Sequence, residues 1–129
     1  MSKRSRDKGK RGERELAEVL REHGWRGAVR GQQRSGLDQA DVVGGPAGWH
    51  FECKRVERLS LWPAWEQAQR DARAGGAGAG IAVVTRRNSS PWLAVVELRV
   101  LLRLIGHEEE ALRAFVADVL AAGNKPPAP

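Results

Sequence analysis

The sequence predicts an α/β fold in which a mixed β-sheet is flanked by helices, in the order α-β-β-β-α-β-β-α. Segments with helical periodicity of apolar residues open, divide and close the chain, and short strand-like runs lie between them. Some runs alternate apolar and polar residues and others are wholly apolar, which favours a sheet with one face partly uncovered. At 129 residues the chain is long enough for one domain with its own core.

An amphipathic helix is expected from about residue 8 to residue 23, with Gly24 ending it. Its inward positions recur at helical spacing, at Leu16, Val19, Leu20 and His23. On a helical wheel Glu13 lies about 60° from Leu16, on the inward side, and the other glutamates lie on the far side: Glu15, Glu18 and Glu22. A carboxylate on the inward side is costly without a partner, so we expect Glu13 to meet a cation or a metal ion.

The stretch WHFECKRV, residues 49–56, predicts a half-buried strand after a short strand near residues 25–30 and a polar loop, GQQRSGLDQ. Its side chains alternate, with Trp49, Phe51 and Cys53 on one face and His50, Glu52 and Lys54 on the other. The preceding strand, ADVV at residues 40–43, leads into the turn GGPAG, so a hairpin is expected. Asp41 would then lie opposite Glu52, directly or through a bulge, whereas a one-residue slip would turn it away.

The second half of the chain predicts a helix, two strands and a final helix. Residues 60–74 are expected to be helical, with Ser60 as N-cap, Gly75 beyond the end, and a stripe of small residues that lets the helix lie close to a sheet: Ala64, Ala68 and Ala72. The strands are GIAVVT and WLAVVEL, and the final helix is expected to break near Gly106. The predicted organisation is a flexible basic arm at 1–7, a single domain at 8–122 with a C-terminal helical part at 97–122, and a disordered tail at 123–129.

The charge distribution favours a polyanionic partner. The formal charge is +6, and the first fourteen residues hold seven Lys or Arg against two acids. Nucleic acid is the commonest polyanion in a cytoplasm, although a solubilising tail has the same composition. The single cysteine excludes an internal disulfide and fits a reducing cytoplasm. We expect neither a secretory signal nor a membrane-spanning segment.

Three carboxylates, Glu13, Asp41 and Glu52, are expected on the rim of one pocket with Lys54 beside them. Their repulsion calls for a cation, and the three histidines show no ligand spacing, so oxygen ligands and Mg²⁺ are predicted, with Mn²⁺ as a substitute. Lys54 is one of two lysines among the seventeen basic residues after position 10. If the ion binds the phosphate group of a substrate, Lys54 would orient or deprotonate the water that attacks the phosphorus, or neutralise charge on the phosphate. By itself, an E-x-K stretch on a strand is more often a surface ion pair.

The neighbouring residues have simpler expected roles. His50 is expected to contact solvent or phosphate beside the carboxylates. Cys53 is expected to be a small core residue. Trp62 and Trp65 are expected to pack in a core or a dimer interface, with stacking on bases as the alternative.

These motifs together resemble the small Holliday-junction resolvases of archaea and certain phages, which belong to the PD-(D/E)xK nuclease superfamily with its restriction-endonuclease-like fold. The resemblance covers roughly residues 8–100, through KGKRGERELAEVLREHGW, AVRGQQRSG, ADVVGG and HFECKR. Carried over by position, it implies the same four catalytic residues: Glu13, Asp41, Glu52 and Lys54. The chain departs from the superfamily pattern at Ala40, where a proline is usual.

The resemblance also implies DNA as the partner and a symmetric homodimer, without a small-molecule cofactor. The implied DNA contacts are Arg14, Arg30, Arg34, Ser35 and Gln67, to which the basic N-terminal segment adds Lys8, Lys10 and Arg11. Two symmetric nicks by in-line attack of water would leave 5′-phosphate and 3′-hydroxyl ends, and a twofold dimer would supply the two pockets. The strand at 92–96 is one candidate dimer interface.

Two other functions stay open from the sequence. One is a nuclease of the same fold that acts on nicked, branched or ordinary duplex DNA, because junction selectivity depends on the shape of a dimer. The other is a non-catalytic DNA-binding module in which the acidic cluster is only structural.

Overall fold

The computed structural model describes residues 2–31 and 41–123. The chain divides into two compact units, residues 1–96 and residues 97–129. The elements follow the predicted order and form a mixed sheet flanked by helices, which confirms the restriction-endonuclease-like fold class. Their bounds are α1 (Lys3–Glu22), β1 (Val29–Arg30), β2 (Val42–Val43), β3 (Trp49–Arg55), α2 (Leu61–Ala74), β4 (Gly80–Arg86), β5 (Leu93–Val95) and α3 (Leu98–Gly123).

The main sheet of the first unit has the strand order β3-β4-β5. β3 and β4 run parallel, and α2 supplies the crossover that parallel neighbours need. The antiparallel strand β5 completes the sheet, and β1 and β2 form a separate antiparallel pair. The predicted hairpin is therefore wrong, because β2 pairs with β1 rather than with β3. β4 offers β3 seven paired residues, from Trp49 to Arg55, whereas β2 is only two residues long.

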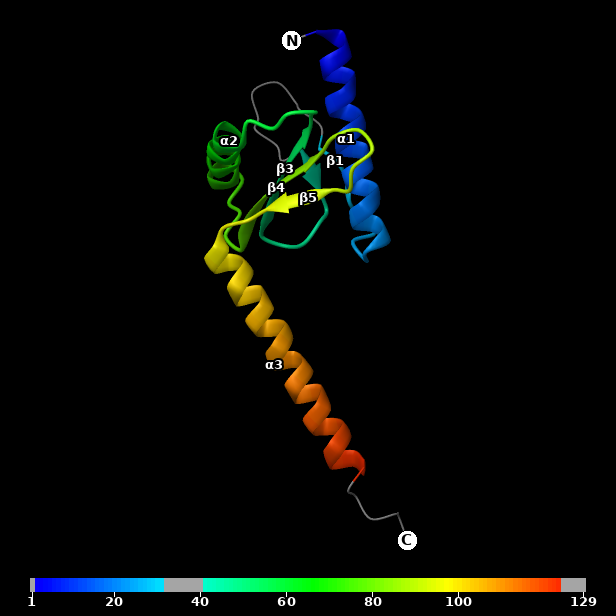
Figure 1. Cartoon of the computed structure of the whole chain (residues 1–129), viewed down its shortest axis with the longest axis vertical. Coiled ribbons are helices and arrows are strands. Elements are labelled where there is room, and N and C mark those ends of the chain that lie inside the picture. The colour runs from blue at the N-terminus through cyan, green and yellow to red at the C-terminus, as the bar shows by residue number, and fades with distance from the viewer. Residues whose placement is uncertain (1, 32–40, 124–129) are drawn as a thin grey trace. The chain divides into compact units, whose positions relative to one another are not determined.

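Helices cover both faces of this sheet, with α1 on one side and α2 on the other (Figure 1). Alternate residues of β4 serve the two sides: Ala82 and Val84 pack with α1, and Val83 packs with α2. On the α2 side the predicted stripe of alanines is buried, at Ala64, Ala68 and Ala72. On the α1 side Trp49, Phe51 and Cys53 of β3 pack against the core, as their alternation predicted.

Helix α1 begins at Lys3, five residues before its predicted start. Ser2 is its N-cap, with its Oγ accepting a hydrogen bond from the Ser5 N–H at 3.2 Å. Residues 3–7, expected as a flexible arm, are therefore helical. Further along, Gly12 lets α1 lie directly on β3, because a Cβ at this position would collide with the Cβ of Arg55.

The second unit contains α3, a continuous helix of 26 residues. The predicted break near Gly106 is wrong, since an interior glycine weakens a helix by only about 1 kcal/mol. None of its described residues is buried, and large apolar side chains recur every seven residues on its surface, at Leu98, Ile105, Leu112 and Val119. Across residues 2–31 and 41–123, no helix has both the length and the apolar character that a membrane crossing requires.

Candidate active site

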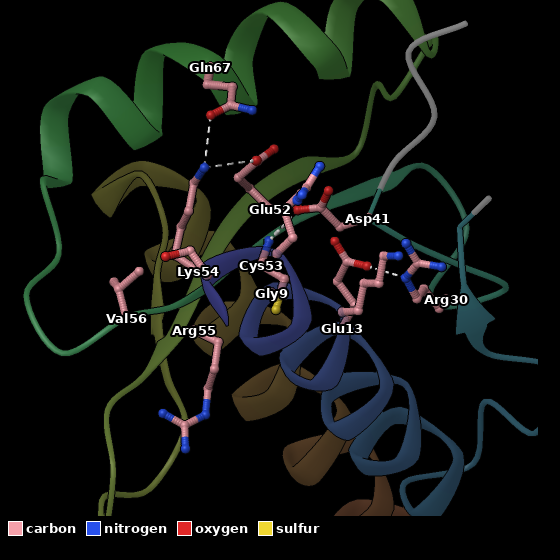
Figure 2. Close-up of a pocket in the computed structure, with 13 residues that line it drawn as sticks. Gly9, Glu13, Arg30, Asp41, Glu52, Cys53, Lys54, Arg55, Val56 and Gln67 are labelled. Atoms are coloured by element: carbon pink, nitrogen blue, oxygen red, sulfur yellow. Dashed lines mark hydrogen bonds and ion pairs between the residues drawn. The ribbon is translucent and has the colours of Figure 1, made fainter. Parts of the chain in front are cut away.

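A pocket of about 500 Å³ lies where α1 and α2 approach β3, the edge strand of the sheet (Figure 2). Four consecutive residues of β3, from Glu52 to Arg55, line the pocket at this edge of the sheet. Its lining includes all four residues predicted to be catalytic: Glu13, Asp41, Glu52 and Lys54.

Glu52 is the most buried of the carboxylates, with 2% of its surface exposed. Its two oxygens have different partners. Oε1 lies 3.6 Å from Lys54 Nζ, and Oε2 lies 3.1 Å from His50 Nε2. Lys54 also donates a hydrogen bond of 2.8 Å to Gln67 Oε1 on α2, so the ammonium is held between the strand and the helix. The predicted parity of β3, with His50, Glu52 and Lys54 on one face, is thus present.

Asp41 reaches the pocket by a route that differs from the predicted hairpin. Its Oδ2 accepts a hydrogen bond of 2.8 Å from the backbone N–H of Cys53, beside Glu52. An edge strand has backbone N–H groups without a partner strand, and this carboxylate satisfies one of them. Burial, and then the nearby Glu52 carboxylate, raise the pKa of Asp41 from 3.8 to about 7. Asp41 and Glu52 are therefore close enough to interact, although their strands are not paired.

Glu13 faces the pocket from α1, and its side chain is 18% exposed. The cation that its inward position predicted is Arg30, whose Nε donates to Glu13 Oε2. Glu15 was expected on the far side of the helix, yet it forms ion pairs with Arg86 at 3.1 Å and Arg55 at 3.6 Å. These pairs join α1 to β3 and β4 and hold the helix that carries Glu13 against the sheet.

The donors around the pocket suit a hard divalent cation. Three carboxylates contribute oxygen atoms, and burial, followed by the nearby Glu52 carboxylate, raises the pKa of Asp41. Among the described residues, however, the potential ligand atoms that lie within 4.8 Å of one another belong to His50, Glu52 and Asp71. The carboxylate oxygens of Glu13, Asp41 and Glu52 do not all lie within this distance of one another, and Glu13 Oε2 instead accepts a hydrogen bond from Arg30.

The residues predicted to bind DNA fall into three groups. Lys10, Arg30 and Gln67 line the pocket, Arg11 and Arg14 are exposed on α1, and Lys8 forms an ion pair with Glu57 at 3.2 Å. Arg34 and Ser35 lie outside the described residues. Arg6 also lines the pocket, which the sequence did not predict because the helix was expected to begin near residue 8. It lies seven residues before Glu13, a spacing that would have indicated the same face of a longer helix.

The neighbouring predictions have mixed outcomes. His50 is 4% exposed, so the expectation that it contacts solvent is wrong. Cys53 packs against the core as expected, and burial raises the pKa of its thiol. Trp65 packs against the core on the α2 side, whereas Trp62 is 71% exposed and does not pack in the core of the chain, so packing in a dimer interface or stacking on bases stays a prediction for Trp62.

Comparison with known families matches residues 4–111 to the archaeal Holliday junction resolvases (Hjc). The match covers most of the 129 residues and includes every pocket residue described above. No curated protein and no solved structure matches the chain. From the extent of the family match, we conclude that the chain belongs to the archaeal Holliday junction resolvase (Hjc) family, and so to the nucleases.

Proposed function

We propose that the protein is a Mg²⁺-dependent endonuclease that resolves four-way DNA junctions by paired, symmetric nicks. The observation that carries this proposal is the pocket at the edge of β3, where the Glu52–Lys54 pair lies beside Asp41 and Glu13. Family membership supports the junction as substrate. The branched partner, the metal and the pairing of the nicks are parts of one proposal, because one metal-dependent pocket cuts one strand and a junction needs two cuts.

We propose Asp41, Glu52 and Glu13 as the residues that hold the divalent ion, with Mn²⁺ able to replace Mg²⁺. All three offer carboxylate oxygens, and burial, followed by the Glu52 carboxylate, raises the pKa of Asp41. Glu13 would contact both the ion and the Arg30 guanidinium, whose Nε donates to Glu13 Oε2. When bound, the ion would supply Lewis acidity at the scissile phosphate.

Lys54 would act on the reacting phosphate and water. Gln67 holds its ammonium at the pocket, 3.6 Å from Glu52, where it can orient the attacking water or offset charge on the phosphate. Attack by water in line with the leaving oxygen forms a new P–O bond and breaks the bond to the 3′-oxygen. The products are a 5′-phosphate and a 3′-hydroxyl.

Basic residues near the pocket would hold the DNA strand. Arg6 and Lys10 are exposed and line the pocket from the same helix as Glu13. Phosphate contacts of this kind supply affinity without sequence preference. The proposed DNA-binding set is Lys8, Lys10, Arg11, Arg14, Arg30 and Gln67, together with Arg34 and Ser35, and the structure adds Arg6.

We propose a homodimer as the active form, since two separated pockets would cut two opposing strands. The candidate interface at β5 exposes little apolar surface, because its other large apolar residues pack against the protein's own core: Trp92, Val95 and Val96. Its large exposed apolar side chain is Leu93, at 60%. The apolar stripe of α3, whose residues recur every seven positions from Leu98 to Val119, is more extensive. Such spacing is typical of helices that pair with each other. A second copy of α3 is therefore the proposed partner of this stripe.

The decisive experiment uses four-way and linear duplex DNA with labelled strands, with and without Mg²⁺. Wild type is expected to nick opposing strands of the junction at symmetric positions, only with Mg²⁺. Glu52→Gln is expected to bind the junction and to lose cutting by roughly two orders of magnitude or more. Comparable cleavage of linear duplex would indicate a general nuclease of this fold. Binding without metal-dependent cutting of any DNA by the wild type would indicate a non-catalytic binding module.

A further inference from the structure

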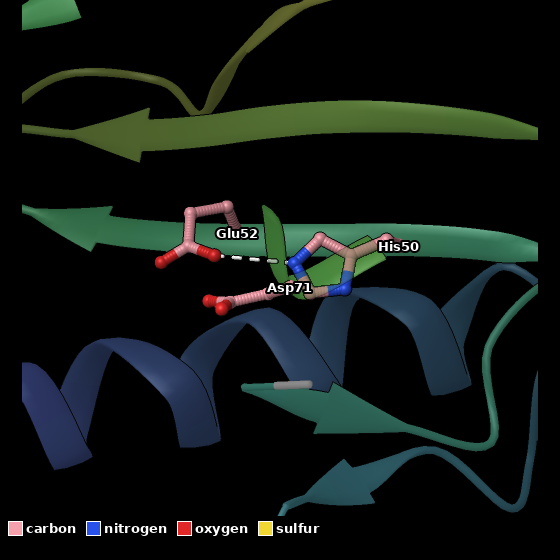
Figure 3. A group of neighbouring side chains, drawn as sticks. All are labelled: His50, Glu52 and Asp71. Atoms are coloured by element: carbon pink, nitrogen blue, oxygen red, sulfur yellow. Dashed lines mark hydrogen bonds and ion pairs between the residues drawn. The ribbon is translucent and has the colours of Figure 1, made fainter. Parts of the chain in front are cut away.

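His50 of β3 and Asp71 of α2 lie beside Glu52 (Figure 3), and His50 contacts Glu52 Oε2, whereas Lys54 is close to Oε1. His50 and Glu52 are among the most buried polar residues of the described chain, at 4% and 2% exposed. A carboxylate oxygen of Asp71, a ring nitrogen of His50 and an oxygen of Glu52 all lie within 4.8 Å of one another. None of the roles assigned above accounts for the histidine or for Asp71.

A buried carboxylate needs a hydrogen-bond donor for each oxygen that water does not reach. Glu52 Oε1 has the Lys54 ammonium at 3.6 Å, and the partner of Oε2 is the imidazole Nε2 at 3.1 Å. A proton on Nε2 makes His50 the donor in either charge state of the ring. His50 is two residues from Glu52 on the same strand face, so the rigid strand sets the direction of this bond.

We propose that His50 is a positioning residue, which locks the Glu52 carboxylate so that Oε1 faces the pocket beside Lys54. The inference deepens the proposed function and rests on it. His50 holds Oε2 and prevents rotation of the carboxylate, which presents one oxygen to a divalent cation in a constant orientation. Residues that hold metal ligands from behind in this way typically change metal affinity by about ten- to a hundredfold when they are replaced.

Direct metal binding by His50, Glu52 and Asp71 is the competing explanation, and the geometry favours positioning. The lining of the 500 Å³ pocket includes Glu52, Asp41 and Glu13 but neither His50 nor Asp71. The Nε2 of His50 already contacts Glu52 Oε2, so this nitrogen is not free to bind a metal ion. Asp71 brings a second negative charge close to Glu52, which makes the donor on His50 more necessary.

The test combines three variants with a control at an exposed histidine. His50→Leu removes the donor, His50→Gln keeps an N–H that can reach Glu52, Asp71→Asn removes the second carboxylate, and His107→Leu is the control on α3. We expect His50→Leu to weaken Mn²⁺ binding, measured by calorimetry on the DNA-free protein, by about tenfold or more. His50→Gln is expected to stay within about threefold of wild type, and Asp71→Asn and His107→Leu should bind Mn²⁺ as wild type does.

A second readout requires no metal. In a double-mutant cycle on the metal-free protein, the fall in melting temperature caused by His50→Leu should be smaller in the Glu52→Gln background, because the buried charge that needs the donor is gone. Additive effects, or Mn²⁺ binding by a folded His50→Leu protein that equals wild type, would overturn the inference. Loss of Mn²⁺ binding in both His50→Gln and Asp71→Asn would overturn it in favour of direct ligation. A wild type that does not bind Mn²⁺ would instead refute the proposed function and, with it, this role for His50.

Discussion

The carboxylate of Asp41 accepts a hydrogen bond from the backbone N–H of Cys53, with 2.8 Å between Oδ2 and N. This bond takes the place of the strand pairing that the sequence predicted between residues 40–43 and β3. It attaches Asp41, the residue directly before β2, to the edge of β3 at the residue directly after Glu52. Two carboxylates are thereby brought together without a ladder of backbone hydrogen bonds, and burial, followed by the Glu52 carboxylate, raises the pKa of Asp41.

The pKa of Asp41 predicts how the stability of the metal-free protein depends on pH. The pKa is raised from 3.8 to about 7 in the folded state, so between these values the folded protein binds more protons than the unfolded chain. Stability from this group is therefore full below pH 4 and is lost as the pH rises through 7. Asp41→Asn should raise the melting temperature at pH 8, and the corresponding gain in the free energy of unfolding should be at most about 4 kcal/mol. At pH 4 the substitution should have little effect.

Mg²⁺ provides the control for this prediction. At pH 8 the ion should raise the melting temperature of the wild type, and it should do so much less for Asp41→Asn, which lacks one proposed ligand. A variant that is less stable than wild type at pH 8 without metal would contradict the electrostatic explanation, because the asparagine Oδ1 can still accept the hydrogen bond from Cys53.

The hydrogen bond between Lys54 and Gln67 predicts unequal effects on catalysis. Lys54→Ala should lower the cutting rate by about 10² to 10⁴, because the group that acts on the water or the phosphate is lost. Gln67→Ala should lower it by roughly tenfold, since the ammonium then loses its 2.8 Å partner but remains in the pocket. Gln69→Ala, two residues along the same helix, is the matched control. Single-turnover cleavage of a labelled junction measures all three, and equal losses for Gln67 and Gln69 would refute a specific role for this bond.

Because residues 3–22 form one helix, each basic side chain of α1 has its own fixed position, and we predict that each contacts DNA independently of the others. Lys10→Ala should weaken junction binding and should reduce the slope of log affinity against log salt by about one, as expected for one lost phosphate contact. Arg73→Ala, an exposed arginine in the last turn of α2 and outside the pocket lining, is the charge-matched control. Binding titrations at several salt concentrations give both slopes, and identical slopes for the two variants would argue against Lys10 as a contact.

The proposed dimer predicts different effects for two exposed leucines of similar exposure. Leu112 lies in the apolar stripe of α3 at 61% exposed, and Leu93 lies on β5 at 60%. Leu112→Lys should convert the protein from a dimer to a monomer in light scattering, because it puts a charge into the helix pair. Leu93→Lys should leave the mass unchanged. The opposite result would move the interface to β5, and a monomeric wild type would remove the dimer from the proposal.

Much of the fold could be read from local pattern. The period of 3.6 residues located α1 and α2, and the alternation along WHFECKRV separated Trp49, Phe51 and Cys53 from the face that carries Glu52 and Lys54. These features depend on neighbours within one turn or one strand, so the sequence is enough to predict them. The same reasoning on a helical wheel selected Glu13 as the inward glutamate and predicted a cation beside it.

The tertiary structure alone decided which strands pair and what lies behind the site. An alternating strand fits a hairpin and a parallel pair equally well, and β3 pairs with β4 because that partner buries a longer apolar surface. The hydrogen bond from Cys53 to Asp41 and the approach of Asp71 to His50 join residues that are distant in sequence. Periodicity carries no information about such contacts, since they depend on how separate elements pack once the chain has collapsed around its core.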